Sequence, residues 1–371
     1  MSIKDLNVAQ TIKSAIDDAL KERGEANILI VGKTGVGKST LVNTVFSGRM
    51  ADTGQGKPVT QAMRKISKAG IPVSIYDTKG LEVKDYKPII EQTMQAIKEL
   101  NGNTDANLHI HVAWICIAED SSRVEDAEIE LAKALHDRHI PVIVVITKAI
   151  ADNGFKSVVE GFFPFARNVV RVHAEPKTLD GGVVIPAHGV ENLVDVTMEV
   201  IPDGQKNAFT AAQRIKIQLK VDRSRAVVLA AAGSAATVGA VPIPFSDAIG
   251  IIPVQIGMLA SITAIFGIDV STGFLTTLVG GTFTSISGSM GGRALVGGLL
   301  KLIPGAGSLV GGAISATVAG ALTTAFGEAY IAVLKSLLSN NPDKVPSATE
   351  IAEALKEKMK SVSVAKWLGR D

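Results

Sequence analysis

The stretch GKTGVGKSTLVN, residues 32–43, limits the folds open to this chain more than any other feature. It fits the spacing GxxxxGK[ST], it follows the apolar β-branched run NILIV, and a helical pattern follows it. Glycines in such a loop let backbone N–H groups turn inward around an anion, and the start of the next helix adds its dipole. The motif therefore predicts a strand, a phosphate-binding loop and a helix in direct succession.

Apolar runs alternate with helical patterns over the first half of the chain. The runs IPVSIY, HIHVAWICIA and PVIVVIT are rich in β-branched residues, and several are separated by helical stretches. This alternation predicts an α/β domain with a mostly parallel sheet and helices on both faces. We place the domain at residues 26–204, after an N-terminal amphipathic helix within residues 1–25. The mixed charge of that helix favours packing on its own protein over a membrane-surface anchor.

The composition changes after residue 204. A basic helical pattern covers 205–225, and residues 226–327 then contain only four charged side chains, Asp247, Asp269, Arg293 and Lys301. The mean hydropathy of the whole chain is +0.28, which is high for a soluble protein. We assign 205–340 to a hydrophobic all-α domain and 341–371 to a charged, helical C-terminal tail.

Four uncharged runs in this second half are long enough to cross a bilayer as helices. They cover 226–246, 248–268, 270–292 and 302–327. They are rich in small residues rather than in Leu, Ile and Phe, so insertion should be marginal. Small residues recur every fourth position, at Gly307, Gly311, Ser315 and Ala319, and beside them at Gly312, Ala316 and Gly320. Such ridges permit close helix contact, either between membrane-associated hairpins or within a soluble bundle.

Specific residues of the first domain are predicted to hold phosphate and metal. Lys38 should reach the β- and γ-phosphates, and the Ser39 hydroxyl should bind Mg²⁺. Asp77 ends the strand in VSIYDTKG and should hold Mg²⁺ through water, while the Gly80 amide should contact the γ-phosphate. Thr60, in the polar segment DTGQGKPVTQ, should close on Mg²⁺ and the γ-phosphate when that loop orders. The predicted nucleotide contacts of the loop are Gly32, Thr34, Gly35, Val36, Gly37, Lys38, Ser39 and Thr40.

The order of these motifs resembles the Era-like and septin-like branch of the Ras-type (TRAFAC) GTPases over about 27–203. GKTGVGKSTLVN is similar to the loops of septins, chloroplast import GTPases and immunity-related GTPases. The segment 205–340 resembles a hydrophobic helical domain of unknown function that is often fused to such GTPases. The resemblance implies hydrolysis of GTP to GDP and phosphate with Mg²⁺. Together with the uncharged runs of the second half, it leads us to expect a nucleotide-dependent switch or mechanochemical protein that acts at a membrane through its helical domain.

The base-reading motif departs from the family pattern [NT]KxD. In VITKAIAD, Thr147 and Lys148 match, and the resemblance places Lys148 along the base. Ile150 stands where the base-reading aspartate is expected, and Asp152 comes two residues later. Either a local bulge brings Asp152 to the base, or the preference for guanine over adenine is weak. In PAHGVENL, the Ala187 amide is the candidate contact to guanine O6, with a bare turn as the alternative.

Hydrolysis by this chain alone is expected to be slow. Leu81 follows Gly80 at the place where Ras-like proteins carry a water-orienting glutamine, and leucine cannot orient water. Thr34 occupies a loop position that is glycine in Ras, close to the γ-phosphate. We expect acceleration by a second copy across the nucleotide face or by an accessory protein.

An alternative function is that of a soluble Era-like assembly factor for ribosome or RNA. The net charge of +2 and the aromatic content of 4% argue against a nucleic-acid partner. The expected partners are instead guanine nucleotide and a membrane or hydrophobic helix. The single Cys116 cannot form an internal disulfide and the first residues do not look like a signal peptide, so we expect a cytoplasmic location. A membrane-bound fraction would lie at the cytoplasmic face.

Overall fold

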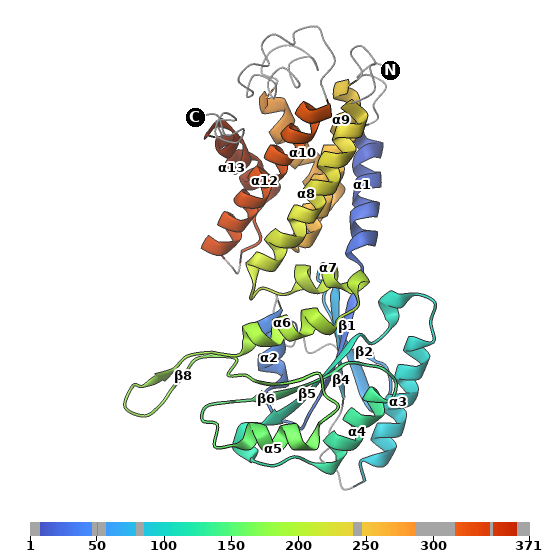
Figure 1. Ribbon diagram of the computed structural model, residues 1–371, viewed down its shortest axis with the longest axis vertical. Coiled ribbons are helices and arrows are strands. Elements are labelled where there is room, and N and C mark those ends of the chain that lie inside the picture. The colour runs from blue at the N-terminus through green and yellow to red at the C-terminus, as the bar shows by residue number, and fades with distance from the viewer. Residues whose placement is uncertain are drawn as a thin grey trace. The chain divides into compact units, whose positions relative to one another are not determined.

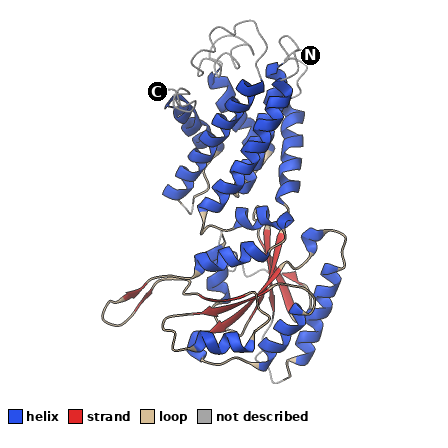
Figure 2. Ribbon diagram, in the orientation of Figure 1, coloured by secondary structure: helices blue, strands red, loops and turns tan. Residues whose placement is uncertain are grey.

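The computed structural model describes residues 8–46, 50, 57–78, 85–239, 247–286, 316–341 and 344–361. The chain divides into two compact units. Residues 24–216 form one, which we call the sheet unit, and residues 1–23 together with 217–371 form the other, which we call the helical unit. Figure 1 traces the chain through both units, and Figure 2 shows that the described strands all lie in one of them.

The sheet unit is built on seven strands in the order β2-β3-β4-β1-β5-β6-β7. Their bounds are β1 Ala26–Val31, β2 Lys57–Pro58, β3 Met63–Ser67, β4 Val73–Thr78, β5 Val112–Ala118, β6 Val142–Thr147 and β7 Asn168–Arg171. The strands from β4 to β7 pair in parallel, whereas β3 and β2 pair antiparallel at one edge. The predicted mostly parallel sheet is confirmed.

Helices cover both faces of this sheet (Figure 2). Their bounds are α2 Lys38–Val45, α3 Lys87–Asn101, α4 Asp126–His136, α5 Phe155–Phe162, α6 Val190–Val200 and α7 Asp203–Ala212. On one face, α3, α4 and α5 form a core with alternate strand residues such as Ile115 and Val144. On the other, Trp114 stacks on Phe46 and donates a hydrogen bond to Thr197 of α6 at 3.2 Å. Burial on both faces explains why these strands are continuously apolar.

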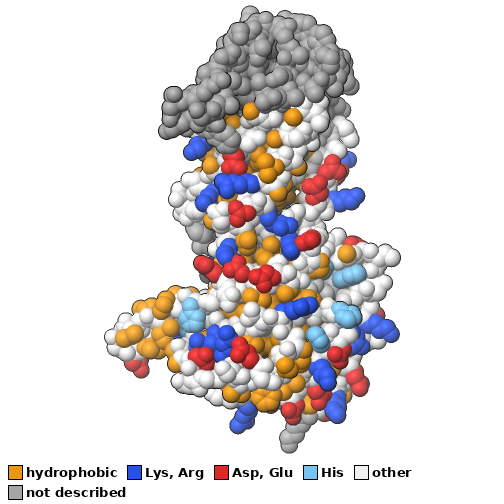
Figure 3. All heavy atoms as spheres, viewed as in Figure 1, with side chains coloured by type: hydrophobic (Ala, Val, Ile, Leu, Met, Phe, Trp, Pro, Cys, Tyr) orange, Lys and Arg blue, Asp and Glu red, His pale blue; other side chains and the backbone are white. Residues whose placement is uncertain are grey.

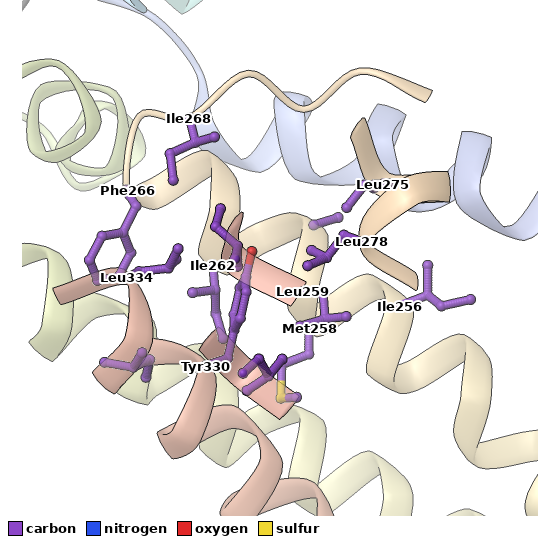
Figure 4. Close-up of a cluster of buried hydrophobic side chains, with 14 of the residues drawn as sticks. Ile256, Met258, Leu259, Ile262, Phe266, Ile268, Leu275, Leu278, Tyr330 and Leu334 are labelled. Carbon is purple, nitrogen blue, oxygen red and sulfur yellow. The ribbon is translucent and has the colours of Figure 1, made fainter. Parts of the chain in front are cut away.

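The helical unit consists of helices from both halves of the chain. They are α1 Val8–Arg23, α8 Ile217–Gly239, α9 Asp247–Ile265, α10 Thr272–Ile286, α12 Ala316–Asn340 and α13 Ala348–Ser361. Helix α1 packs on α9 and α10, α8 packs on α9 and α12, and α13 packs on α10 and α12. Figure 4 shows the core at the contact of α9, α10 and α12, with Leu259, Leu278 and Tyr330 directed toward one another.

The structure groups the terminal segments with the helical unit. The sequence predicts an N-terminal helix within 1–25 and a charged helical tail at 341–371 as separate segments, and residues 1–23 and 341–371 both belong to the helical unit. Ile12 and Ile16 of α1 are buried in its core because α1 supplies an apolar face that α9 and α10 cover. The N-terminal helix therefore packs on its own protein, as its mixed charge predicts.

The boundary between the units lies after residue 216 rather than after 204. The basic pattern 205–225 is not one helix, because α7 ends at Ala212 and α8 begins at Ile217. The buried Gln213 side chain donates to the Lys216 carbonyl at 3.0 Å and accepts from its N–H at 2.8 Å. These hydrogen bonds hold a turn where helical periodicity alone predicts continuation.

Close packing by small residues is confirmed where the structure describes them. Gly307, Gly311, Gly312 and Ser315 lie outside the described residues, whereas Ala316, Ala319 and Gly320 lie on α12. Ala319 is fully buried, and a Cβ added to Gly320 would lie 3.3 Å from the carbonyl oxygen of Ala232 in α8. Among the described residues, one helix, Ala319–Asn340, is long and apolar enough to cross a membrane by length and composition, with a mean hydropathy of 1.3.

Candidate nucleotide-binding site

The loop of residues 32–37 joins β1 to α2 in a conformation that needs glycine. Gly32 and Gly37 have φ angles of 148° and 101°. A residue with a side chain rarely adopts such positive φ angles, because its Cβ atom would clash with the backbone. A Cβ on Gly32 would lie 2.5 Å from the Cys116 carbonyl oxygen on β5, which forbids any larger residue there. The loop therefore starts against the sheet, and Thr34 and Gly35 at its tip are exposed.

Lys38, the first residue of α2, folds back over this loop. Its ammonium group donates to the carbonyl oxygens of Gly32 at 2.5 Å and Lys33 at 2.9 Å. Ser39 and Thr40 follow in the first turn of α2, and both are exposed. A lysine ammonium placed over a glycine-rich loop at the start of a helix can bind the oxygens of a phosphate chain.

Thr147 connects this loop to the end of β6. Its hydroxyl donates to the Val36 carbonyl oxygen at 2.6 Å, and the residue is buried. The predicted base-side threonine thus holds the phosphate-binding loop in place. Lys148 follows with a φ angle of 51° and forms an ion pair with Asp120 at 3.3 Å.

Glu119, which the sequence analysis missed, holds the segment after Lys148. It lies directly after β5, is 9% exposed, and accepts from the N–H groups of Ile150 at 2.5 Å and Ala151 at 3.0 Å. Asp152 is not drawn to the same place: it is exposed and accepts from the N–H of Lys156 at 3.3 Å, at the start of α5. An acid that ends a fully apolar strand was the available signal for Glu119.

Ala187 follows a projecting hairpin of β8, Lys177–Thr178, and β9, Val184–Ile185. Figure 3 shows apolar side chains gathered on this arm, and Val183 and Val184 are 61% and 57% exposed. Ala187 is exposed, and the adjacent His188 ring contacts the Ala149 carbonyl oxygen at 3.0 Å through Nε2. The segment with Ala187 therefore reaches the loop after β6.

Asp77 lies on β4, next to the strand that enters the phosphate-binding loop. It is paired with Ile30 of β1 in the sheet register. Arg64 of β3 donates to its Oδ2 atom from Nε at 3.0 Å and from Nη2 at 2.8 Å. Its Oδ1 atom is buried and has no hydrogen-bond partner among the described residues. One carboxylate oxygen is thus held by arginine, and the other is available to a ligand.

Two of the predicted site residues, Thr60 and Gly80, are not seen in a ligand-binding arrangement. The Thr60 hydroxyl accepts from the N–H groups of Ala62 at 3.1 Å and Met63 at 3.0 Å, so it stabilises the turn before β3. Thr60 also lines a hollow of about 520 Å³ against α3. It therefore takes part in a local turn here, and any metal contact requires that turn to open. Gly80 and Leu81 lie outside the described residues.

A second set of charges lies beside the phosphate-binding loop. Lys33 forms an ion pair with Glu125 at 2.6 Å, just before α4. Burial raises the pKa of Glu128, in the first turn of α4, to about 7, although the Glu125 N–H bond and Lys33 act in the opposite direction. Burial also raises the pKa of the Cys116 thiol to about 12, so this cysteine stays a core thiol.

Comparisons with known proteins agree with this geometry. Residues 27–148 match the family described as 50S ribosome-binding GTPase, and residues 204–361 match a domain of unknown function, DUF697. Cell division control protein 10 of Candida albicans is 25% identical over 183 residues, which cover 41% of this chain and 51% of the relative. GTPase Der of Wolinella succinogenes is 30% identical over 126 residues, which cover 33% of this chain and 24% of the relative.

Among solved structures, the chain resembles a probable GTP-binding protein engB at 18% identity and a TM-score of 0.34, covering 47% of this chain and 98% of that one. The chain spans about half the length of the curated relatives it matches first. The phosphate-binding loop lies inside the first family match, and the second match covers most of the described helical unit. Residues 27–148 therefore match a P-loop GTPase domain of the TRAFAC type, and residues 204–361 match a DUF697 helical domain.

Proposed function

We propose that this chain binds GTP with Mg²⁺, hydrolyses it to GDP and phosphate, and changes the behaviour of its helical unit with the nucleotide state. One observation carries the proposal. The Lys38 ammonium lies over the glycine loop, and the adjacent strand β4 supplies the buried, unpartnered Oδ1 of Asp77. The first residue of α2 thus provides a cation for phosphate, and the strand next to β1 provides an acceptor for metal.

The phosphate chain would be bound by the loop and the first turn of α2. The N–H groups from Gly35 to Thr40 would surround it, and Thr34 would lie beside the γ-phosphate. The Lys38 ammonium would exchange its two carbonyl partners for β- and γ-phosphate oxygens. Because Lys38 already lies over the loop, little side-chain ordering is required on binding.

The residues present fit Mg²⁺. A buried carboxylate oxygen without a partner is a suitable acceptor for a hard cation or its bound water, and Asp77 Oδ1 has that character. Ser39 would supply a hydroxyl, and Thr60 would do so after its turn opens. When bound, Mg²⁺ neutralises the charge that develops on the β- and γ-phosphate oxygens. Gly80 would place its amide at the γ-phosphate.

Hydrolysis would depend on a group from outside the chain, because Leu81 cannot orient water. A second copy that meets the nucleotide face would supply it. The test is phosphate release from GTP over a range of protein concentrations. We expect the rate per molecule to rise with concentration and to be unchanged by Leu81→Ala, with Lys38→Ala and Ser39→Ala inactive. Fast turnover at high dilution would contradict the dimer, and no release at any concentration would contradict hydrolysis.

Guanine would be preferred, but by less than in a protein with a base-reading aspartate. Ile150 has an apolar side chain that is 43% exposed, so it offers no carboxylate to guanine. A competition titration of GTP against ATP measures the preference. Equal affinities would reduce the proposal to a general nucleoside triphosphatase.

The helical unit would act at the cytoplasmic face of a membrane or on a hydrophobic helix of a partner. The support is Ala319–Asn340, which is long and apolar enough to cross a membrane, and Leu229 on α8, which is 69% exposed. The test is flotation of the full-length chain with liposomes in GDP and in a non-hydrolysable GTP analogue, with Lys38→Ala as control. Flotation in one nucleotide state only would support a membrane switch. A chain that never floats and sediments with ribosomes would favour the assembly-factor alternative, which the family description keeps open.

A further inference from the structure

A partly buried ion pair lies next to the loop that follows β6. Oε1 of Glu119 accepts from Arg171 Nε at 2.8 Å and lies 2.7 Å from Nη2. The two side chains are 10% and 22% exposed. Glu119 directly follows β5 and Arg171 ends β7, and these two strands lie on either side of β6. The pair therefore connects the two strands across the loop between them.

The other oxygen of Glu119 holds that loop. Oε2 accepts from the N–H groups of both Ile150 and Ala151. In a trans peptide the C=O points opposite to the N–H, and no peptide bond in the described chain is cis. The carbonyl groups of Ala149 and Ile150 are therefore directed away from Glu119. The Ala149 oxygen meets His188 Nε2 at 3.0 Å, so its position is fixed from the far side.

At residue 150, where the base-reading aspartate is expected, the available hydrogen-bond acceptor is therefore a backbone carbonyl group. Guanine presents two donors, N1–H and the 2-amino group, and needs acceptors opposite them. The Ile150 side chain supplies none, and Asp152 is turned to the start of α5. The Ile150 carbonyl is an acceptor of the right type, and its direction depends on the two hydrogen bonds to Glu119.

We propose that Glu119 and Arg171 are positioning residues that set the base selectivity of the site by fixing the direction of the Ile150 carbonyl. This inference rests on the proposed binding of guanine nucleotide. Glu119 acts on the base only through the loop, and Arg171 acts by holding the Glu119 carboxylate. A buried carboxylate without Arg171 would lose its compensating charge, so both members of the pair are required.

The experiment measures the dissociation constants of GDP and ADP for the full-length chain by calorimetry. The variants are Glu119→Gln, Arg171→Met and Arg171→Lys. Asp195→Asn is the matched control, because it breaks the ion pair to Lys216 in the same unit, at 2.6 Å. Asp152→Asn tests the competing acceptor. Partial unfolding weakens the apparent affinity for GDP and for ADP by the same factor. The ratio of the two dissociation constants is therefore unchanged by a loss of stability alone.

We expect Glu119→Gln and Arg171→Met to weaken GDP binding about tenfold or more while ADP binding is kept, because charged hydrogen bonds to the base loop are lost. Arg171→Lys should recover part of the ratio, and Asp195→Asn should not change it. An unchanged ratio in Glu119→Gln, or a ratio abolished by Asp152→Asn instead, overturns the inference. A wild-type ratio of one overturns both this inference and the guanine preference, and is seen before any variant is made.

Discussion

The two units of this protein use their buried polar groups for different purposes. In the sheet unit, Thr147 and Glu119 direct their hydrogen bonds to loop backbone at the ends of the strands, where a ligand would bind. In the helical unit, Thr263 and Tyr330 bond to each other at 2.7 Å, and Lys220 donates to the Phe266 carbonyl at 3.0 Å. The first unit is organised around a site, and the second around its own packing. Variants in each should therefore fail in different assays.

The largest effect is expected from Lys38→Ala in the sheet unit. Its ammonium donates to two loop carbonyls that a phosphate chain would replace, so triphosphate affinity should fall about a hundredfold or more. The measurement is calorimetry with a non-hydrolysable GTP analogue, together with thermal unfolding, which should be unchanged. Lys133→Ala, an exposed lysine in the last turn of α4, serves as control. Unchanged affinity would remove the site assignment.

The helical unit should respond to Ile12→Ala instead. Ile12 is 1% exposed and lies in the core that α1 shares with α9 and α10. Loss of its side chain should reduce the free energy of unfolding by about 2–4 kcal/mol, as measured by urea denaturation, and leave nucleotide affinity unchanged. Val8→Ala, at 41% exposure on the same helix, should cost about 0.5 kcal/mol or less. Equal effects at both positions would show that α1 is not part of this core.

Two glycines sharpen the comparison within the helical unit. A Cβ on Gly327 of α12 would lie 2.5 Å from a methyl group of Val228 in α8, so Gly327→Ala should destabilise the unit by about 1–3 kcal/mol. A Cβ added to Gly257 of α9 would have no described atom within 4 Å. Gly257→Ala should therefore stabilise the helical unit by about 0.5–1 kcal/mol, because alanine favours the helix over glycine. Chemical denaturation of both variants gives the two signs. A stabilising Gly327→Ala would mean that α8 and α12 are not in close contact.

The helical unit should also show a pH dependence from Lys220. Burial lowers its pKa from 10.5 to about 7 in the folded chain. Between pH 10.5 and 7 the unfolded chain therefore binds a proton that the folded chain does not, and the free energy of unfolding falls as pH is lowered through this range. The slope should be about 1 kcal/mol per pH unit, and below pH 7 it should vanish. Lys220→Met should remove this slope between pH 7.5 and 9.5, and an identical slope in both proteins would contradict the assignment.

The phosphate-binding loop could be predicted because its residues are contiguous. Residues 32–39 carry their glycines, lysine and serine at fixed spacing, and the flanking strand and helix follow the same local pattern. Asp77 could be proposed for a similar reason, because it lies near the end of an apolar strand. The apolar strands β1, β4, β5 and β6 and the all-helical second half also follow from periodicity, whereas the order of the strands in the sheet does not.

Contacts between distant residues were not predictable in this way. Glu119 and Arg171 are 52 positions apart, and only the order β5-β6-β7 brings them together. The break between α7 and α8 depends on Gln213 and on the Arg214 N–H, which donates to the Val45 carbonyl at 3.0 Å. Membership of α1 in the helical unit depends on helices made more than 200 residues later. Each of these is decided by tertiary packing, which local patterns do not record.

The position of α1 has a consequence for how the chain is made. Helices α9 and α10, which cover its apolar face, begin at Asp247 and Thr272. During synthesis α1 therefore emerges from the ribosome long before these two helices have been made. At 5–20 residues per second the delay is roughly ten seconds to a minute. The sheet unit, residues 24–216, is completed during that time. Ile12 and Ile16 are then open to chaperones and to other nascent chains, and variants of α1 should lower the cellular yield of folded protein more than the activity of what is purified.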